Sequence, residues 1–220
     1  MSAAEFFKGA ESSTCFHDDF AGQVANGETN SMQLTSRFEE ALIYAVRLHA
    51  GQFRKGTEIP YATHLLSVAS IALQHGANET EAIGALLHDA IEDQGGTATR
   101  EEIRRRFGNE VVAIVDGCTD SDTVPKPPWK ARKAAYIEHV RKASPSVRLV
   151  SASDKLDNAR AILADYRVLG ESLWERFHGG KDGTLWYYRD LVNAFREAGN
   201  SSLVEELGLV VSEIERLAGK

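Results

Sequence analysis

The sequence predicts an all-α fold, a helical bundle of about ten helices with little or no β-structure. Two observations predict helices. After residue 33 the apolar residues recur every three to four positions, and capping residues and glycines mark the ends of these stretches. A third observation argues against sheets, because almost no stretch alternates apolar and polar residues between turn signals.

Each N-terminal helix is expected from a signal at its start and another at its end. The start signal is a capping pair or a proline, and the end signal is often a glycine. In chain order, the expected helices run from Ser36 with Glu39 to His49, from Pro60 to about Gln74, from Asn78 with Glu81 to Gly95, from Thr99 with Glu102 to Gly108, and around residues 111–115.

Two loops separate the remaining expected helices. Residues 119–128 hold three prolines in four positions, which excludes a continuous helix. Residues 179–183 are rich in glycine and form the second expected loop. The helices expected around these loops cover 129–142, 145–169 with Ser144 as its cap, 184–198 and 201–218.

Composition narrows the class of protein. The 220 residues suit one large domain or two small ones, and 43% apolar with 26% charged residues is ordinary for a globular chain. The net charge of −7 argues against a nucleic-acid partner, which normally meets a basic face. We expect a cytoplasmic protein, because the chain shows no signal peptide, no apolar run long enough for a membrane span, and only two distant cysteines.

The segment His88-Asp89-Ala90-Ile91-Glu92-Asp93 carries the strongest chemical signal. On a helix these side chains would lie on adjoining stripes, and such a cluster next to an apolar helix needs a compensating cation. His64 on the preceding helix and Asp154 on the long later helix would complete two imidazoles and two carboxylates. A mixed nitrogen and oxygen set suits Mn²⁺, Fe²⁺, Zn²⁺ or Co²⁺ better than Mg²⁺.

The order His64, His88-Asp89, Asp154 resembles the signature of the HD superfamily. The chain is similar, more specifically, to the hydrolase domain of RelA/SpoT homologues and to stand-alone small alarmone hydrolases such as metazoan SpoT homologues. The stretches that carry this resemblance are Gly51-Gln52-Phe53-Arg54-Lys55-Gly56, Pro60 to His64, Leu86 to Asp93, Phe107-Gly108 and Asp154-Lys155-Leu156-Asp157-Asn158-Ala159-Arg160.

The resemblance implies a role for each matching residue. It implies one divalent metal ion, most often Mn²⁺ in this family, held by His64, His88, Asp89 and Asp154. It implies that Glu92 and Asp93 are the acid/base pair that activates the attacking water, with Asn158 beside that water. The residues implied to contact the nucleotide are Arg54, Lys55, Tyr61, Asn158 and Arg160.

The implied activity is hydrolysis of the 3′-pyrophosphate of (p)ppGpp to GDP or GTP and pyrophosphate. We expect no synthetase activity, since no segment remains after Lys220 for that domain. The same site leaves two alternatives open, a (p)ppApp hydrolase and an NADPH 2′-phosphatase. A catalytically silent nucleotide-binding protein is the alternative from another class.

Composition and the resemblance together divide the chain into parts. Residues 1–33 are expected to be an N-terminal extension and residues 34–200 the HD phosphohydrolase domain, while 201–220 form a helix packed on that domain or used in a homo-oligomer. The chain departs from the family at Ser151 and Ser153, and at Asp157, where an aromatic residue or a histidine is frequent. These departures leave the nucleotide preference open.

Overall fold

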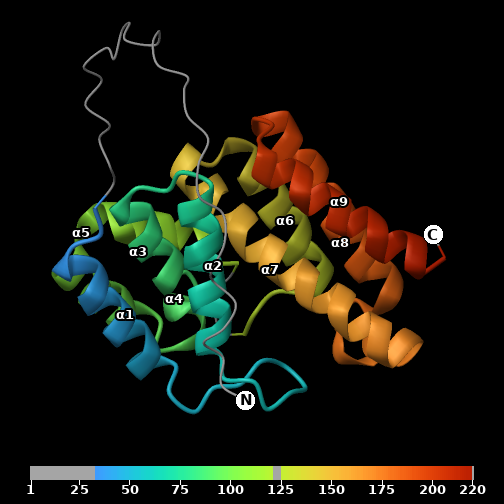
Figure 1. Cartoon of the computed structure of the whole chain (residues 1–220), viewed down its shortest axis with the longest axis horizontal. Helices are drawn as coiled ribbons and strands as arrows, with labels where there is room; N and C mark the ends of the chain where they lie inside the picture. Colours follow the sequence, from blue (N-terminus) through green and yellow to red (C-terminus); the bar gives the residue numbers. More distant parts are fainter. Residues whose placement is uncertain (1–32, 121–124, 220) are drawn as a thin grey trace, which may run out of the picture. The chain divides into compact units, whose positions relative to one another are not determined.

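The computed structural model describes residues 33–120 and 125–219, and these residues are helical apart from their connections. Most of the expected N-terminal extension lies outside the described residues. The elements are α1 (Ser36–Leu48), α2 (Ala62–Gln74), α3 (Glu79–Leu87), α4 (Ala90–Asp93), α5 (Thr97–Cys118), α6 (Trp129–Lys142), α7 (Pro145–Leu169), the 3₁₀ helix η1 (Gly170–Arg176), α8 (Gly180–Ala198) and α9 (Ser202–Leu217) (Figure 1).

The all-α prediction is confirmed, with a smaller helix count. Among the described residues, eight α-helices have nine residues or more, rather than about ten, since α4 is a single turn and η1 is 3₁₀. The β-structure within the described ranges is one isolated bridge between Phe53 and Pro60. No helix in these ranges is both long and apolar enough to cross a membrane.

Capping chemistry explains where several helices begin. Asn78 accepts from the backbone of Glu81, whose side chain accepts from Asn78 N–H, so the expected capping pair of α3 forms in full. Ser144 caps α7, which has Pro145 in its first turn. The cap of α1 is Thr35 rather than Ser36, one residue earlier than expected.

Three expectations about helix continuity need correction or detail. The third helix does not continue through residues 88–93. It ends at Leu87, the dihedral angles of Asp89 (φ −98°, ψ −1°) lie at the edge of the helical region, and α4 begins at Ala90. The expected loop 179–183 is mostly the first turn of α8, which begins at Gly180. At Gly108 the positive φ of 86° interrupts α5, where the sequence predicted a stop.

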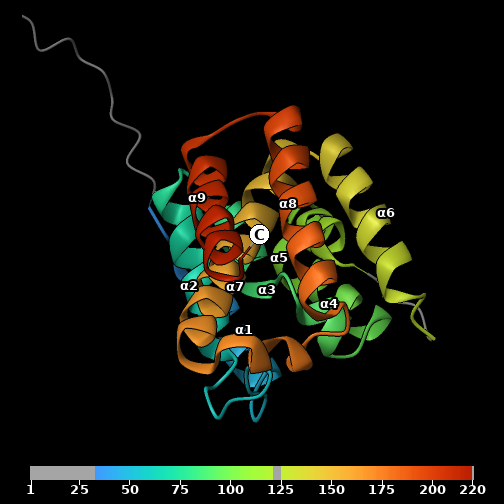
Figure 2. The same cartoon turned by 90° about the vertical axis from the view of Figure 1, so that its right-hand side faces the viewer.

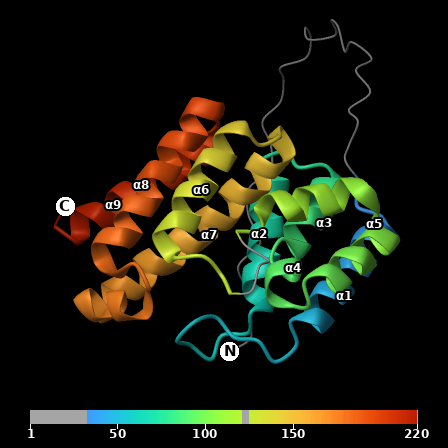
Figure 3. The ribbon, with the colours of Figure 1, turned by 180° about the vertical axis from the view of Figure 1, so that it is seen from behind.

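The described helices bury two apolar clusters that meet along α7. One cluster is built from α1–α5 and includes Val150 of α7, and the other is built from α6–α9 and includes Ile71 of α2. Accordingly α7 contacts α2, α3 and α5 as well as α9, and Figure 1 shows it running between the two groups. Helices α6 and α8 lie side by side (Figure 2), on the side of α7 away from α1 (Figure 3).

Candidate metal centre and adjoining pocket

Four side chains from different elements meet beside α7. His64 lies on α2, His88 follows α3, Asp89 precedes α4 and Asp154 lies on α7. The Nε2 atom of His64 is 3.3 Å from Asp154 Oδ1 and 3.6 Å from Asp89 Oδ2. The Nε2 atom of His88 is 3.0 Å from Asp89 Oδ2 and 3.6 Å from Asp154 Oδ1.

These distances suit a shared metal ion. Ligand atoms about 2.1 Å from one ion are separated by roughly 3.0–3.4 Å for octahedral or tetrahedral geometry. One atom of each of His64, His88 and Asp154 lies within 4.8 Å of the other two, and all three residues are buried. The three therefore form a candidate metal site, with Asp89 beside it.

In its neutral form, His88 directs the lone pair of its Nε2 atom into this site. His88 Nδ1 lies 2.9 Å from the carbonyl oxygen of Ala85, which can only accept, so Nδ1 carries the proton. In the neutral ring the Nε2 atom is then an acceptor. It is buried without a hydrogen bond among the described residues and faces another acceptor, Asp89 Oδ2, at 3.0 Å. A buried nitrogen of this kind is what a metal ligand looks like without its ion.

The charges of the site compensate one another. Burial opposes a charge on His64, but hydrogen bonds with Asp154, Asp157 and Asp89 outweigh it and raise its pKa to about 9. Lys155 Nζ lies 2.5 Å from Asp154 Oδ2, and despite burial this ammonium helps hold the pKa of the Asp154 carboxyl well below its usual range. The carboxylates of this cluster therefore favour a bound cation, either a metal ion or a proton on a histidine.

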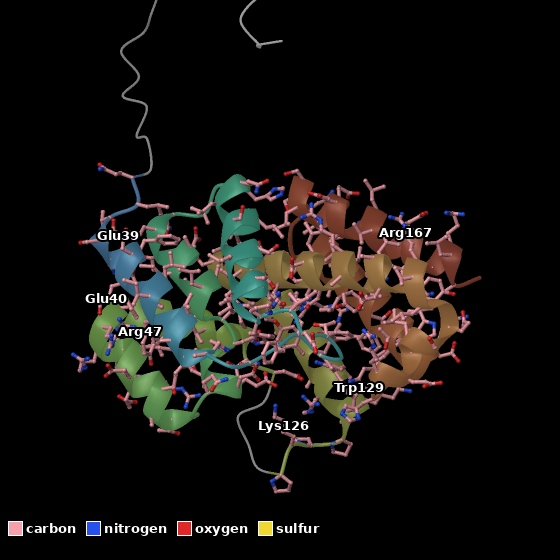
Figure 4. All side chains as sticks on the ribbon, turned by 60° about the horizontal axis from the view of Figure 1, so that its bottom comes forward. Glu39, Glu40, Arg47, Lys126, Trp129 and Arg167 are labelled. Carbon is pink, nitrogen blue, oxygen red and sulfur yellow. The ribbon has the colours of Figure 1, made fainter. Side chains whose placement is uncertain are left out.

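The two acidic residues of α4 sit at the edge of the site in different surroundings. Asp93 Oδ2 accepts from Gln52 Nε2 at 2.8 Å, and partial burial together with the charge of Asp89 raises its pKa. Glu92 Oε1 is 2.6 Å from Lys126 Nζ, and its Oε2 accepts from the backbone N–H of Asp120 at 3.1 Å. Lys126 lies on the segment before α6 (Figure 4).

Tyr61 links the metal centre to a neighbouring cavity. Its hydroxyl donates to Asp89 Oδ2 at 2.5 Å, and its ring lines the cavity. The ring also stacks on His49 with 5.3 Å between centroids. His49 is buried and hydrogen-bonded to Gln52, which donates to Asp93, so His49 helps to position Asp93 through Gln52.

The cavity has a volume of about 390 Å³ and combines cations with aromatic rings. The cations that line it are Arg54, Lys55, Lys133 and Lys155, and the aromatic residues are Tyr61, Trp129, Phe177, His178, Tyr187 and Tyr188. Thr184 Oγ1 and Tyr187 OH are buried at its wall without a hydrogen-bond partner among the described residues. Such a cavity suits a ligand with phosphates, hydrogen-bonding groups and a flat ring.

The far wall of the cavity depends on a close contact between α6 and α8. A Cβ atom on Gly179 would come within 2.5 Å of the Trp129 ring, so only glycine lets the start of α8 approach that ring. Trp129 begins α6 (Figure 4). Burial lowers the pKa of Lys133, whose ammonium lies 2.9 Å from Asp120 and 4.9 Å from the Tyr187 ring centroid.

The structure brings most of the expected substrate residues to this cavity, but not Arg160. Arg54, Lys55, Tyr61 and Asn158 line it. Arg160 instead pairs with Glu206 of α9, and its side chain is 45% exposed. The reason is helical geometry, because two residues along α7 turn a side chain by about 200°, to the face opposite Asn158.

Several contributing residues were not assigned a role from the sequence. Asp157 contacts His64, Lys155 pairs with Asp154, and Gln52 holds Asp93. Each lies within two residues of a residue singled out by the sequence, which is the signal that could have found it. Lys133 and Tyr187 lie far from those motifs, and only the packing of α6 and α8 brings them in.

Comparisons with known proteins agree with this geometry. The chain is 40% identical over 124 residues to guanosine-3′,5′-bis(diphosphate) 3′-pyrophosphohydrolase MESH1 of Xenopus tropicalis, and 39% identical over 125 residues to the Homo sapiens protein of that name. Each alignment covers 55% of this chain and 66% of the relative, slightly less than two thirds of its length.

A solved structure has a similar fold over most of the chain. It is a metazoan orthologue of SpoT described as hydrolysing ppGpp and playing a role in starvation responses. It superposes with a TM-score of 0.68 and 29% identity, covering 85% of this chain and 98% of the other. In addition, the family model for the HD domain matches residues 41–181, more than half of the sequence. The chain therefore belongs to the HD-domain family.

Proposed function

We propose that this chain is a metal-dependent phosphohydrolase that removes the 3′-pyrophosphate of (p)ppGpp, giving GDP or GTP and pyrophosphate. One observation carries this proposal: the candidate metal centre and the cationic, aromatic cavity share a wall. Lys155 and Asn158 both line the cavity, and each contacts Asp154 at 2.5 Å. A phosphate in the cavity would therefore lie beside the metal ligands.

The names of the relatives support the choice of substrate. Two proteins about 40% identical to this chain are called guanosine-3′,5′-bis(diphosphate) 3′-pyrophosphohydrolases, and the similar solved structure is described as hydrolysing ppGpp. The cavity residues are compatible with such a nucleotide, since rings such as Trp129 can stack on a purine and Lys55 can pair with phosphate. We therefore propose that the binding partner is a guanine nucleotide and not a nucleic acid.

We propose that His64, His88, Asp89 and Asp154 hold one Mn²⁺ ion. The mixed nitrogen and oxygen donors and the unpartnered Nε2 of His88 support this assignment. A divalent cation bound there would supply positive charge that polarises a water molecule and neutralises phosphoryl oxygens.

The residues of α4 would handle the attacking water. We propose Asp93 as the general base, because partial burial and the Asp89 charge raise its pKa and so favour uptake of a proton. Gln52 keeps the Asp93 carboxylate in place. Glu92, held by Lys126 and the Asp120 backbone, would orient the water, together with Asn158.

Arg54 and Lys55 would bind the nucleotide from the connection between α1 and α2. Arg54 donates to Asp157 and Asn158, which hold its guanidinium at the rim of the cavity. Lys55 and the more buried Lys155 would meet the negative charge of the pyrophosphate.

The direct test is to incubate the purified full chain with Mn²⁺ and ppGpp and to separate the products by chromatography. We expect equal amounts of GDP and pyrophosphate, and no products once EDTA removes the metal. Nucleotide binding without turnover at micromolar enzyme would contradict the proposal and identify a silent nucleotide-binding protein instead.

A further inference from the structure

The carboxylate of Asp157 contacts three side chains that lie on other elements. Its Oδ2 atom is 2.6 Å from His64 Nδ1 and 3.1 Å from Arg54 Nη1. Its Oδ1 atom accepts from the hydroxyl of Ser67 at 2.5 Å. The side chain is 16% exposed, so these contacts are partly shielded from water. One carboxylate thus touches both a candidate metal ligand and a residue of the cavity.

These contacts belong to a closed ring of interactions. Arg54 Nη2 donates to Asn158 Oδ1 at 3.0 Å, and Asn158 Nδ2 donates to Asp154 Oδ1 at 2.5 Å. Asp154 Oδ1 lies 3.3 Å from Nε2 of His64, which returns to Asp157 through its other nitrogen. The ring includes two candidate metal ligands and two residues that line the cavity.

Within this ring of interactions, Asp157 is a charged carboxylate that fixes the orientation of its partners. Burial opposes its charge, but hydrogen bonds from His64 and Ser67 and the charge of Arg54 keep the pKa of this carboxyl below its usual value. A carboxylate that accepts from Nδ1 places the His64 proton there and turns Nε2 toward the other ligands. The same oxygen restricts Arg54 to one orientation, since a guanidinium has a fixed fork of donors.

We propose that Asp157 is a positioning residue that couples the metal ligand His64 to the nucleotide-binding residue Arg54. This inference rests on the proposed function, because it takes His64 as a metal ligand and Arg54 as a nucleotide contact. A nucleotide that binds Arg54 would thereby also affect the orientation of His64, because both side chains contact the same Asp157 oxygen.

The test compares Mn²⁺ affinity, measured by calorimetry on the metal-free chain, among three variants. Asp157→Ala should weaken Mn²⁺ binding about 10- to 100-fold, as expected when the partner of a ligand histidine is lost. Asp157→Asn can present its oxygen to His64 and Arg54 and its amide to Ser67, so the loss should be between about twofold and tenfold. Asp165→Ala is the matched control, since Asp165 is also on α7 and lines the cavity but pairs with Arg176, and it should keep the Mn²⁺ affinity of the parent.

A double-mutant cycle tests the link to Arg54. The effect of Arg54→Ala on Mn²⁺ affinity is measured in the parent and in the Asp157→Ala background. If Asp157 couples the two sites, these two effects should differ at least about twofold. An effect of the Arg54 charge acting through space would be the same in both backgrounds. Asp157→Ala should also raise KM for ppGpp. Thermal unfolding in EDTA establishes that the variants are folded, and if Asp157→Ala is not, the cycle is run with Asp157→Leu, which fills the space but accepts no hydrogen bond from Arg54 or His64.

The results separate this inference from the proposed activity. Parent-like Mn²⁺ affinity in Asp157→Ala, or equal effects of Arg54→Ala in both backgrounds, would overturn the coupling even if the parent hydrolyses ppGpp. Conversely, a parent without hydrolysis but with the expected Mn²⁺ affinities would refute the activity and leave the role of Asp157 intact.

Discussion

The two apolar clusters of the described residues contribute different parts of the site. The α1–α5 group supplies three of the four candidate metal ligands from short motifs, with His88 and Asp89 adjacent in sequence. The α6–α9 group supplies cavity walls from residues as far apart as Trp129 and Tyr187, which share no motif. Reactive groups are therefore concentrated along the sequence, whereas the recognition surface is assembled from dispersed positions. Helix α7 joins them, because it carries Asp154 as well as Asn158.

The largest expected effect tests whether α7 completes the metal centre. Asp154→Asn keeps an oxygen for Lys155 but removes the negative charge that a carboxylate ligand contributes to binding a divalent cation. We expect Mn²⁺ affinity to fall more than about 100-fold, beyond the effect of losing a supporting partner, and hydrolysis to fall with it. Retention of Mn²⁺ binding in calorimetry would show that the α1–α5 residues form the centre without α7.

The next effect separates chemistry from metal binding within the α1–α5 group. Asp93→Asn should lower kcat about 10²- to 10⁴-fold, because an amide cannot take up the proton of water. Glu92→Gln should have a smaller effect, since Glu92 is already paired with Lys126. Mn²⁺ affinity should stay within a few-fold of the parent in both variants. Normal turnover of Asp93→Asn would refute its assignment as the base.

A pH dependence of metal binding is expected from the same group. In the metal-free chain the carboxylates raise the pKa of His64 to about 9, so below that pH a metal ion must displace a proton. Affinity for Mn²⁺ should therefore increase as pH rises from 6.5 to 8.5, by about tenfold per unit for one displaced proton. Calorimetry across this range provides the measurement. A flat profile would mean that His64 does not lose a proton on binding.

The smallest expected effect lies in the α6–α9 group. Tyr187→Phe removes a buried hydroxyl that has no partner among the described residues. We expect an unchanged or slightly higher unfolding temperature, and a KM for ppGpp raised about 2- to 12-fold if the nucleotide accepts or donates a hydrogen bond there.

Tyr136→Phe is the matched control for that substitution. Its hydroxyl is equally buried but bonded to Ser151 at 2.6 Å, and the residue does not line the cavity. This variant should lose about 1 kcal/mol of stability and keep its KM. The opposite pattern, a KM effect at Tyr136 and none at Tyr187, would contradict the placement of the nucleotide against α8.

Local sequence signals predicted the fold well where they act within one helix. The bounds of α6 and α7 agree with the expected ranges, and the capping pair of α3 forms. The signals failed at junctions, as at Asp89, where the third helix breaks, and at Gly180, where a glycine-rich stretch begins a helix. At such junctions, contacts such as that between Gly179 and Trp129 outweigh local propensity.

The residues of the site also fall into those that the sequence identifies and those that only the packing of helices reveals. The residue types and order of His64, His88 and Asp154 are readable from the chain because metal binding requires few kinds of donor. Arg160 was misplaced, because a motif does not reveal which face of α7 points into the cavity. Asp157 was noticed only as a departure, because its role depends on partners about ninety residues away.

Amino-acid order alone specified the helical class, most helix ends and the set of donors for a cation, since these depend on neighbours within a few residues. The spacing of those donors, the cavity beside them and the ring through Asp157 and Arg54 arose only when α2, α7 and α8 packed together. The physical reason is range. Capping and periodicity act over one or two turns, whereas contacts across helices depend on the volumes and orientations of many side chains at once.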